Sequence, residues 1–456
     1  MRSPSPAAPV VPPRDETTGG LRPWQAWYAV GVLTLANISG AIDRQIFTSL
    51  VGPVKRDLGL SDTQISLLMG FGFSVFFSVF GLAIGRLVDQ RRRTWIVALG
   101  AMLWSVLTAA TGAARSYTQL LLTRVGVGVG EATLTPAAVS LIADAFPRRR
   151  LGTAMSVYML GTFFGSGVSY ALGAWVVSQA DAPGVVSVPL LGAVHPWQTV
   201  FIIIGLPGLL VAALALTVRE PLRAVAAVAT STAGRSELRS YLQRHARTMT
   251  ALCLGFMCSA SVNWAIGAWL QAFFVRTHGW SIAQAGALQG ALTMGLGPLG
   301  TMVGGWLADR DRNRGVIDAP LRVGMLGAAG MLLCAGAYPL VGSATIAAAL
   351  LVPVNLFAAM PWGAANAAVA EALPSRLRGQ GAAVFQLLVG LAGGIGPTAV
   401  ALLTDQLFGN DAALRWSLAI VTVVGMALTL CILGWGRPAY RATVTALATD
   451  PAERVA

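Results

Sequence analysis

The chain consists largely of long continuous apolar runs, separated by short breaks rich in charge, proline or glycine. Most runs are about 18–27 residues long, the length that an α-helix needs to cross the hydrocarbon core of a bilayer. Barrel strands are shorter and alternate polar with apolar positions. The pattern predicts an all-α polytopic membrane protein with twelve transmembrane helices, at residues 24–50, 62–88, 94–113, 117–143, 152–178, 197–218, 246–275, 281–307, 321–342, 345–371, 378–404 and 413–436.

Composition agrees with this pattern. Of the 456 residues, 55% are hydrophobic and only 11% are charged, and the mean hydropathy is +0.66. A soluble chain of this length needs far more charge to cover its surface. We therefore expect a multi-pass integral membrane protein, in the inner membrane if the cell is bacterial.

The net charge of +13 is unevenly placed along the chain. Basic clusters lie in alternate loops, at 91–93, 148–150, 219–247, 310–314 and 376–378, whereas the intervening loops carry few. This is the positive-inside pattern, which predicts that both termini lie in the cytoplasm. The basic excess then indicates contact with anionic lipids and no nucleic-acid partner.

Two short motifs recur along the chain. "GRLVDQRRR" at 85–93 returns as "GWLADRDRNR" at 305–314, and Asp309 follows Asp89 by 220 residues (309 − 89). "FPRRRLGTA" and "LPSRLRGQG" likewise align Pro147 with Pro374. Such repeats predict two homologous six-helix halves. The expected organisation is a disordered tail at 1–23, a bundle at 24–218, a basic linker at 219–245, a second bundle at 246–436 and a cytoplasmic tail at 437–456.

These motifs together resemble the major facilitator superfamily of secondary transporters. Within it, "DRQIF", "LSDTQISLLMGFGFSVFFSVFG", "RVGVGVGEA" and "GGIGPTAVALLTD" resemble the Spinster-like branch, which includes exporters of lysolipids and sphingolipid phosphates. The resemblance covers about residues 24–436. The chain departs from the family pattern at Arg92 and Arg312, where the loop usually carries glycine, and at Gln271, where relatives carry proline.

Charged residues within the apolar runs are the first candidates for function, because a charge in the membrane is costly unless it faces a cavity or a partner. At about 1.5 Å per residue, Asp43 and Arg124 lie at similar depths on two helices, so we expect them to meet. Glu131 lies seven residues beyond Arg124, on nearly the same helix face. The glycines at 126, 128 and 130 are expected to let neighbouring helices approach closely.

Glu131 is the predicted site of proton coupling, since burial of a carboxylate in a poorly hydrated cavity favours its protonated form. Asp43 is a second candidate, although Arg44 beside it and Arg124 within its reach favour the ionised form, in which Asp43 is expected to be a structural or gating partner. Arg44 and Arg124 are candidates for an ion pair or for holding an anionic substrate. The resemblance implies similar roles for these four residues. The alternative is a static lattice of ion pairs that stabilises the N-terminal half.

A second group lies in the loops that follow the second helix of each half. The resemblance implies that these residues form a conformational latch between the halves, while the alternative is a topological anchor that needs only the basic residues. The candidates are Gly85, Asp89, Arg92, Arg93, Gly305, Asp309 and Arg310.

The C-terminal half has almost no charge inside its apolar runs, so it is expected to line the apolar part of an amphipathic site. Packing and interhelical hydrogen bonds are the alternative role for such residues. The possible cavity-lining residues are Asn263, Trp264, Trp269, Gln271, Trp362, Asn366, Phe385 and Gln386.

Several classes of protein are excluded or disfavoured. Lys55 is the only lysine and lies in "GPVKRD", so the chain has no G-x-x-x-x-G-K-[ST] phosphate loop and no ATP-driven pump is expected. The sequence shows no spacing typical of metal ligands and no nucleophile arrangement, which predicts neither cofactor nor metal, and no enzyme. The four cysteines lie in apolar runs and are expected to pack.

The sequence therefore predicts a secondary transporter of an amphiphilic anion such as a lysophospholipid, coupled to protons, with sodium as an alternative ion. A small organic anion such as a sugar acid is the rival substrate, because Arg44 and Arg124 suit a carboxylate. A ligand-binding receptor without net transport is the alternative from another class. A monomer is expected from the resemblance.

Overall fold

The computed structural model describes residues 21–180, 186–188, 192–221, 232–374 and 377–449. The predicted N-terminal tail to residue 20, residues 222–231 of the predicted linker and the end of the chain from residue 450 lie outside the described residues.

The first half of the chain folds almost entirely into helices. Its elements are α1 (Pro23–Leu58), α2 (Asp62–Ser66), η2 (Leu67–Phe71), α3 (Gly72–Gln90), α4 (Arg93–Thr111), α5 (Tyr117–Glu131), α6 (Leu134–Ala145), α7 (Arg148–Ala180), the strands β1 (Val186–Val188) and β2 (Gly192–Val194), and α8 (Pro196–Thr217). The two strands pair antiparallel, with Val186 opposite Val194.

The second half is helical throughout its described part. Its elements are α9 (Thr232–Arg244), α10 (Ala246–His278), α11 (Ile282–Asn313), α12 (Ala319–Ala337), η3 (Tyr338–Leu340), α13 (Ala344–Ala359), α14 (Pro361–Glu371), α15 (Arg378–Leu402), η5 (Leu403–Phe408), η6 (Asp411–Ala413) and α16 (Leu414–Thr449).

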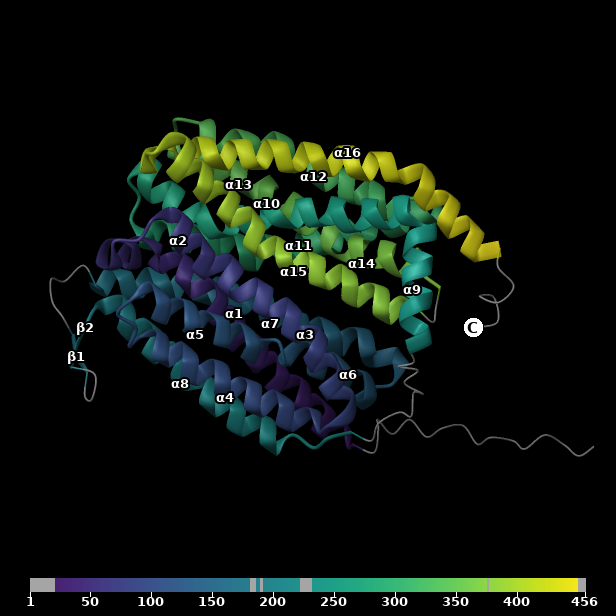
Figure 1. The fold of residues 1–456 in the computed structure, drawn as a ribbon, viewed down its shortest axis with the longest axis horizontal. Helices are drawn as coiled ribbons and strands as arrows, with labels where there is room; N and C mark the ends of the chain where they lie inside the picture. Colours follow the sequence, from purple (N-terminus) through teal and green to yellow (C-terminus); the bar gives the residue numbers. More distant parts are fainter. Residues whose placement is uncertain (1–20, 181–185, 189–191, 222–231, 375–376, 450–456) are drawn as a thin grey trace, which may run out of the picture.

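The long helices run side by side as two bundles (Figure 1). Helices α1 to α8 form one bundle and α10 to α16 the other, and they meet mainly where α7 packs on α11 and α3 on α15. We call the end at which α1 begins and α16 ends the near end, and the opposite end, where α1 ends and α16 begins, the far end. Helix α9 lies across the near end of the second bundle, and Tyr241 on it donates a hydrogen bond to Ala372 O at 2.8 Å.

A helix or a pair of helices lies within a few residues of the beginning of each range that the hydrophobic pattern predicts. In the described part of the chain, nine stretches are long and apolar enough to cross a membrane. Helices α1, α7 and α11 are of comparable length, with 36, 33 and 32 residues, but lie outside these nine. The all-helical multi-span fold is thus confirmed.

The structure differs from the predicted ranges in continuity and in length. The range 117–143 is interrupted at Ala132 and Thr133, and 345–371 is interrupted at Met360. Pro136 and Pro361 lie in the first turns of the following helices, where a missing backbone N–H is tolerated. Helix α16 continues to Thr449, so the predicted C-terminal tail is helical up to that residue.

The glycines of α5 permit close helix packing, as the sequence predicts. A Cβ atom at Gly128 would lie 2.8 Å from Phe73 O on α3, and one at Gly130 would lie 2.9 Å from Trp104 N on α4. At Gly126 it would lie 2.4 Å from Leu107 Cδ1. Real Cβ atoms rarely approach so closely, and the backbone atoms facing Gly128 and Gly130 cannot move aside as the end of the Leu107 side chain can, so α5 requires glycine at Gly128 and Gly130 to occupy this place.

Candidate functional site

Four charged residues lie together inside the first bundle, two on α1 (Asp43 and Arg44) and two on α5 (Arg124 and Glu131). Arg44 on α1 pairs with Glu131 on α5 through Nη1 and Oε2. Gly40 lies one turn before Arg44, and a Cβ there would come within 3.2 Å of Glu131 Oε2. The absence of a side chain at Gly40 therefore leaves room for the Glu131 carboxylate against α1.

The two members of this pair differ in their exposure. The Arg44 side chain is 19% exposed, whereas that of Glu131 is 1% exposed. The second carboxylate oxygen, Oε1, has no hydrogen-bond partner among the described residues. A buried carboxylate with only one partner depends strongly on that partner, because an uncompensated charge in a low-dielectric interior is very unfavourable.

Arg124 lies about two turns before Glu131 on α5 and is held mainly by aromatic rings. Its guanidinium carbon is 4.7 Å from the ring centre of Phe47 and 5.0 Å from that of Phe201, which are cation–π distances. Nη1 donates to the main-chain oxygen of Asp43 at 3.2 Å, while Nε and Nη2 have no hydrogen-bond partner among the described residues. The structure thus brings Asp43 and Arg124 together, but through the backbone of Asp43.

Asp43 is 1% exposed, and its Oδ1 also has no hydrogen-bond partner in the described part of the chain. Two buried carboxylates and two arginines thus lie within one small region, with several polar atoms unsatisfied. Such groups are costly in a purely structural core. Their arrangement suits a site that exchanges a proton or binds an anion.

Three cavities extend from these charges into the second bundle. The first is lined by both arginines, by Phe47, Leu68, Met69, Phe73 and Ser74, and by Trp264. The second shares Trp264 with it and has about 770 Å³ of empty space, part of it open to solvent. The third shares Asn263 and Trp362 with the second and has about 350 Å³ of empty space, which also includes open solvent. The wall of the third cavity is mainly apolar, with Phe256, Phe385 and Val389 in it.

Six of the predicted cavity residues line the second or third cavity, namely Asn263, Trp264, Trp362, Asn366, Phe385 and Gln386. The other two lie elsewhere. Trp269 is fully buried and donates from Nε1 to Pro397 O at 2.9 Å. Gln271 lines a small pocket nearer the far end, with Thr48, Ser49 and Arg276.

The predicted latch residues lie at the near end. Arg93 is buried and pairs with Asp144 and with Glu220, whose Oε1 is 3.1 Å from Nε. Asp309 is 73% exposed and pairs at 3.3 Å with Arg312 on its own helix, while Arg312 also pairs with Glu371. All these partners belong to the same bundle as the residue that they contact.

The remaining latch candidates have fewer described contacts. Arg92 precedes α4 and is exposed, and the guanidinium carbon of Arg310 lies 5.3 Å from the ring centre of Trp306. A Cβ atom at Gly85 or at Gly305 would meet nothing within 4 Å. Asp89 lies on α3, and its side chain is outside the described residues.

Sequence reasoning missed several polar residues of the second cavity, namely Gln45, Tyr170, Gln289 and Thr293. Each is a polar residue within an apolar run, and Gln45 directly follows Arg44. This signal was available but weak, because such residues often serve only as interhelical hydrogen-bond partners.

A model of the Major Facilitator Superfamily matches residues 33–397, which is most of the chain. The chain belongs to the Major Facilitator Superfamily. It is 30% identical over 423 residues to an MFS-type efflux pump of Mycolicibacterium smegmatis, covering 90% of this chain and 92% of that protein. It is 26% identical over 363 residues to a probable L-galactonate transporter of Escherichia coli, covering 75% of this chain and 76% of that one.

Among solved structures, the fold is similar to a bacterial homologue of the human lysosomal transporter Spinster in an inward-facing and unoccupied conformation. The TM-score is 0.76 at 25% identity, covering 93% of this chain and 98% of that one. The predicted family and the Spinster-like resemblance are confirmed. This member of the superfamily is therefore a multi-pass membrane protein and a secondary transporter, and it is not an enzyme.

Proposed function

We propose that this transporter moves an amphiphilic anion such as a lysophospholipid by alternating access, coupled to protons at Glu131. One observation carries the proposal. The three adjoining cavities begin at two arginines and end in a mainly apolar pocket. A molecule with an anionic head and a hydrocarbon tail matches this gradient from charge to apolar surface.

The head group would contact Arg44, which is part-exposed to the cavity, and Arg124, which has unsatisfied N–H donors. Arginine suits phosphate and carboxylate groups because its donors form a planar fork. The tail would lie against Phe256, Phe385 and Val389 in the third cavity. The first bundle would thus supply the charges that bind the head group, and the second bundle the apolar surface that binds the tail.

Coupling follows from competition for Arg44. When an anion takes the guanidinium of Arg44, Glu131 loses its one hydrogen-bond partner among the described residues and becomes a buried carboxylate without compensation. Protonation removes this penalty, so anion binding favours proton binding, and the reverse holds by linkage. Asp43 is the secondary proton site in this scheme, and sodium is the alternative ion.

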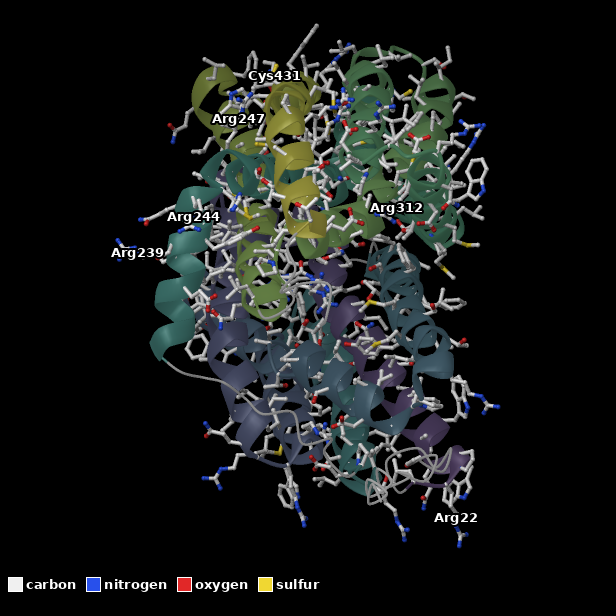
Figure 2. All side chains as sticks on the ribbon, turned by 90° about the vertical axis from the view of Figure 1, so that its right-hand side faces the viewer. Arg22, Arg239, Arg244, Arg247, Arg312 and Cys431 are labelled. Carbon is white, nitrogen blue, oxygen red and sulfur yellow. The ribbon has the colours of Figure 1, made fainter. Side chains whose placement is uncertain are left out.

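The topology belongs to the same proposal. Helices α1, α7 and α11 cross the membrane together with the nine apolar stretches, which gives twelve spans in two six-helix halves. The near end faces the cytoplasm, since arginines gather there. Arg22, Arg239 and Arg244 extend from the molecule at that end (Figure 2). The near-end residues of α3 and α11, with Arg92 and Arg93 at the start of α4, act as the latch, and the protein works as a monomer.

A second candidate substrate is a small organic anion such as a sugar acid. The similarity to a probable L-galactonate transporter favours it. Such a substrate would use Arg44, Arg124 and the polar residues of the second cavity, and it would leave the third cavity empty.

The deciding experiment measures accumulation of a labelled lysophospholipid and of a labelled sugar acid in proteoliposomes under an imposed proton gradient. Wild type is compared with Glu131→Gln. Asp57→Asn is a matched control, because it is also a carboxylate-to-amide change, but its partners His195 and Trp197 lie at the far end of the same bundle.

We expect proton-driven movement of the lysophospholipid that is lost in Glu131→Gln and kept in Asp57→Asn. Movement of the sugar acid alone would overturn the substrate assignment and leave the coupling assignment intact. Wild-type coupled accumulation in Glu131→Gln would show that the proton site lies elsewhere.

A further inference from the structure

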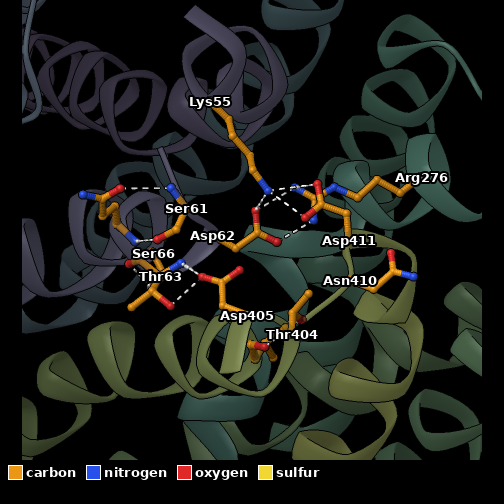
Figure 3. Close-up of polar contacts among 12 residues, drawn as sticks. Lys55, Ser61, Asp62, Thr63, Ser66, Arg276, Thr404, Asp405, Asn410 and Asp411 are labelled. Atoms are coloured by element: carbon orange, nitrogen blue, oxygen red, sulfur yellow. Dashed lines mark hydrogen bonds and ion pairs between the residues drawn. The ribbon is translucent and has the colours of Figure 1, made fainter. Parts of the chain in front are cut away.

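Four charged residues meet at the far end, where the two bundles touch. They are Lys55 on α1, Asp62 on α2, Arg276 on α10 and Asp411 on η6 (Figure 3). We propose that these residues, the Asp62 cluster, form a reversible gate that closes the far end of the transport path. The proposal rests on the proposed alternating access, and its test is independent of the substrate.

Asp62 is the centre of the cluster and is fully buried. Its Oδ1 accepts from Lys55 Nζ at 2.7 Å, within its own bundle. Arg276 of the other bundle binds both carboxylate oxygens, Nη1 to Oδ2 at 2.5 Å and Nη2 to Oδ1 at 2.8 Å. A bidentate arginine–carboxylate pair is among the strongest and most directional of polar contacts.

Lys55 forms a second bond between the bundles. Its Nζ is 2.8 Å from Asp411 Oδ1 and 2.9 Å from Oδ2. Asp411 also lies beside Arg276 of its own bundle, with 3.9 Å between Nη2 and Oδ2. Each bundle therefore contributes one cation and one carboxylate to the cluster.

This composition makes the cluster separable. If the bundles part at the far end, Lys55 stays with Asp62 on one side and Arg276 stays with Asp411 on the other. Breaking a single buried ion pair is costly because it leaves a buried charge without a partner. Here each bundle keeps a neutral pair when the bundles part, so this cost does not arise. A permanent structural contact has no need for such an arrangement, whereas a gate that opens in every cycle does.

Next to the cluster, α2 and η2 contact the second bundle along a seam that also holds the two bundles together. Thr63 donates from its backbone N and from Oγ1 to Asp405 Oδ2, both at 2.6 Å. Ser66 Oγ and Thr398 Oγ1 are 3.3 Å apart, and a Cβ at Gly70 would lie 2.8 Å from Gly394 Cα. Thr63 and Ser66 on α2 and Gly70 on η2 are three to four positions apart, and all three contact the other bundle.

A small pocket lies next to the cluster, between α1 and α10. It is lined by Arg276 and by three buried polar residues, Thr48, Ser49 and Gln271. Neither the side-chain amide of Gln271 nor Ser49 Oγ has a hydrogen-bond partner among the described residues. Thr48 lies one turn beyond Arg44 on α1, so polar groups continue from the Arg44–Glu131 pair towards the gate, as a path for an anionic head requires.

The test measures the distance between spin labels on the two bundles at the far end. Labels at Arg115→Cys and Ser343→Cys, both exposed far-end positions, are placed in a background without the four native cysteines. Arg276→Gln should raise the ratio of far-open to far-closed molecules at least about tenfold, a change that corresponds to about 1.4 kcal/mol.

Arg415→Gln is the matched control. It removes an arginine from the same end, but Nη2 of Arg415 donates to Leu340 O within its own bundle. We expect wild-type distances in this variant. An Arg276→Gln distribution equal to wild type would overturn the gate, whatever the transport assays show.

Asp405→Ala provides a second test if Arg276→Gln does not fold. It removes the acceptor of both Thr63 contacts while leaving the four residues of the Asp62 cluster in place, and it should shift the distances in the same direction by a smaller factor. Unchanged distances in Asp405→Ala would contradict the role of this seam. If neither labelled compound accumulates in the proteoliposomes while Arg276→Gln opens the far end, the substrate assignment fails and the gate stands.

Discussion

At the scale of single residues, the chemistry of the site depends on which buried charges meet. Depth along the helices predicts that Asp43 meets Arg124, and the structure places them in contact through a main-chain oxygen. Glu131 instead has Arg44 as its partner. The sequence places all four residues in the membrane region, but their pairing depends on helix rotation and on the space at Gly40, which only the packed structure defines.

The Arg44–Glu131 pair can be tested by a double-mutant cycle. We expect Arg44→Gln and Glu131→Gln each to lower the stability of the protein, because each leaves a buried or half-buried charge without its partner. The double variant should lose less than the two losses combined, with a coupling of about 1–3 kcal/mol. Unfolding in detergent micelles measures these energies.

Arg247, whose guanidinium donates to Trp435 O, serves as a distant control. Arg247→Gln combined with Glu131→Gln should be additive. Equal coupling in both cycles would contradict a direct interaction between Arg44 and Glu131.

At the scale of elements, the apolar pattern predicts the helices well but their interruptions poorly. The position and extent of a long apolar helix follow from local composition, because its hydrogen bonds are all internal. The breaks before Leu134 and at Met360 depend on how neighbouring helices satisfy the freed backbone groups. The glycine spacing of α5 is an exception, since small residues at a helix interface are visible in the sequence.

Close packing of α5 predicts that Gly130→Ala destabilises the protein, since the new Cβ would lie 2.9 Å from Trp104 N on α4. We expect a loss of about 1–3 kcal/mol from overpacking, visible as a lower Tm in detergent. Gly31→Ala on α1 is the control, because a Cβ there meets nothing within 4 Å. A loss in Gly31→Ala as large as that in Gly130→Ala would show that the effect is not steric.

At the scale of the whole molecule, the two bundles are each held together at the near end by their own ion pairs. In the second bundle, Asp318 just before α12 accepts from Arg437 at 2.5 Å and from Arg441 at 3.0 Å, both on α16. Burial by itself raises the pKa of Asp318, but the hydrogen bonds from the two arginines outweigh it and lower the pKa below its ordinary value. The charges at the near end thus fix α16 to α12.

This shift predicts the pH dependence of stability. A carboxyl whose folded pKa is lowered stabilises the fold above its unfolded pKa of about 3.9, and the contribution is lost as the pH falls below that value. Asp318→Asn should therefore lower Tm at pH 7, by the equivalent of about 1–2 kcal/mol, and the difference from wild type should shrink below about pH 4.

Asp309→Asn is the control for this series, since Asp309 is largely exposed and its pairing with Arg312 is solvent-screened. Its Tm should follow wild type at every pH. A difference between Asp318→Asn and wild type that stays constant down to pH 3 would contradict the proposed linkage.

The sequence by itself determined the class of fold, the superfamily, the approximate helix ranges and the buried charges, because hydropathy and short motifs are local properties. The tertiary structure alone decided which charges pair and which surfaces line a cavity. Asp62 and Arg276 are separated by 214 positions, and nothing in their local sequence indicates that they meet. Pairing between distant helices depends on the rotation and contact of whole bundles, which is the property that alternating access changes.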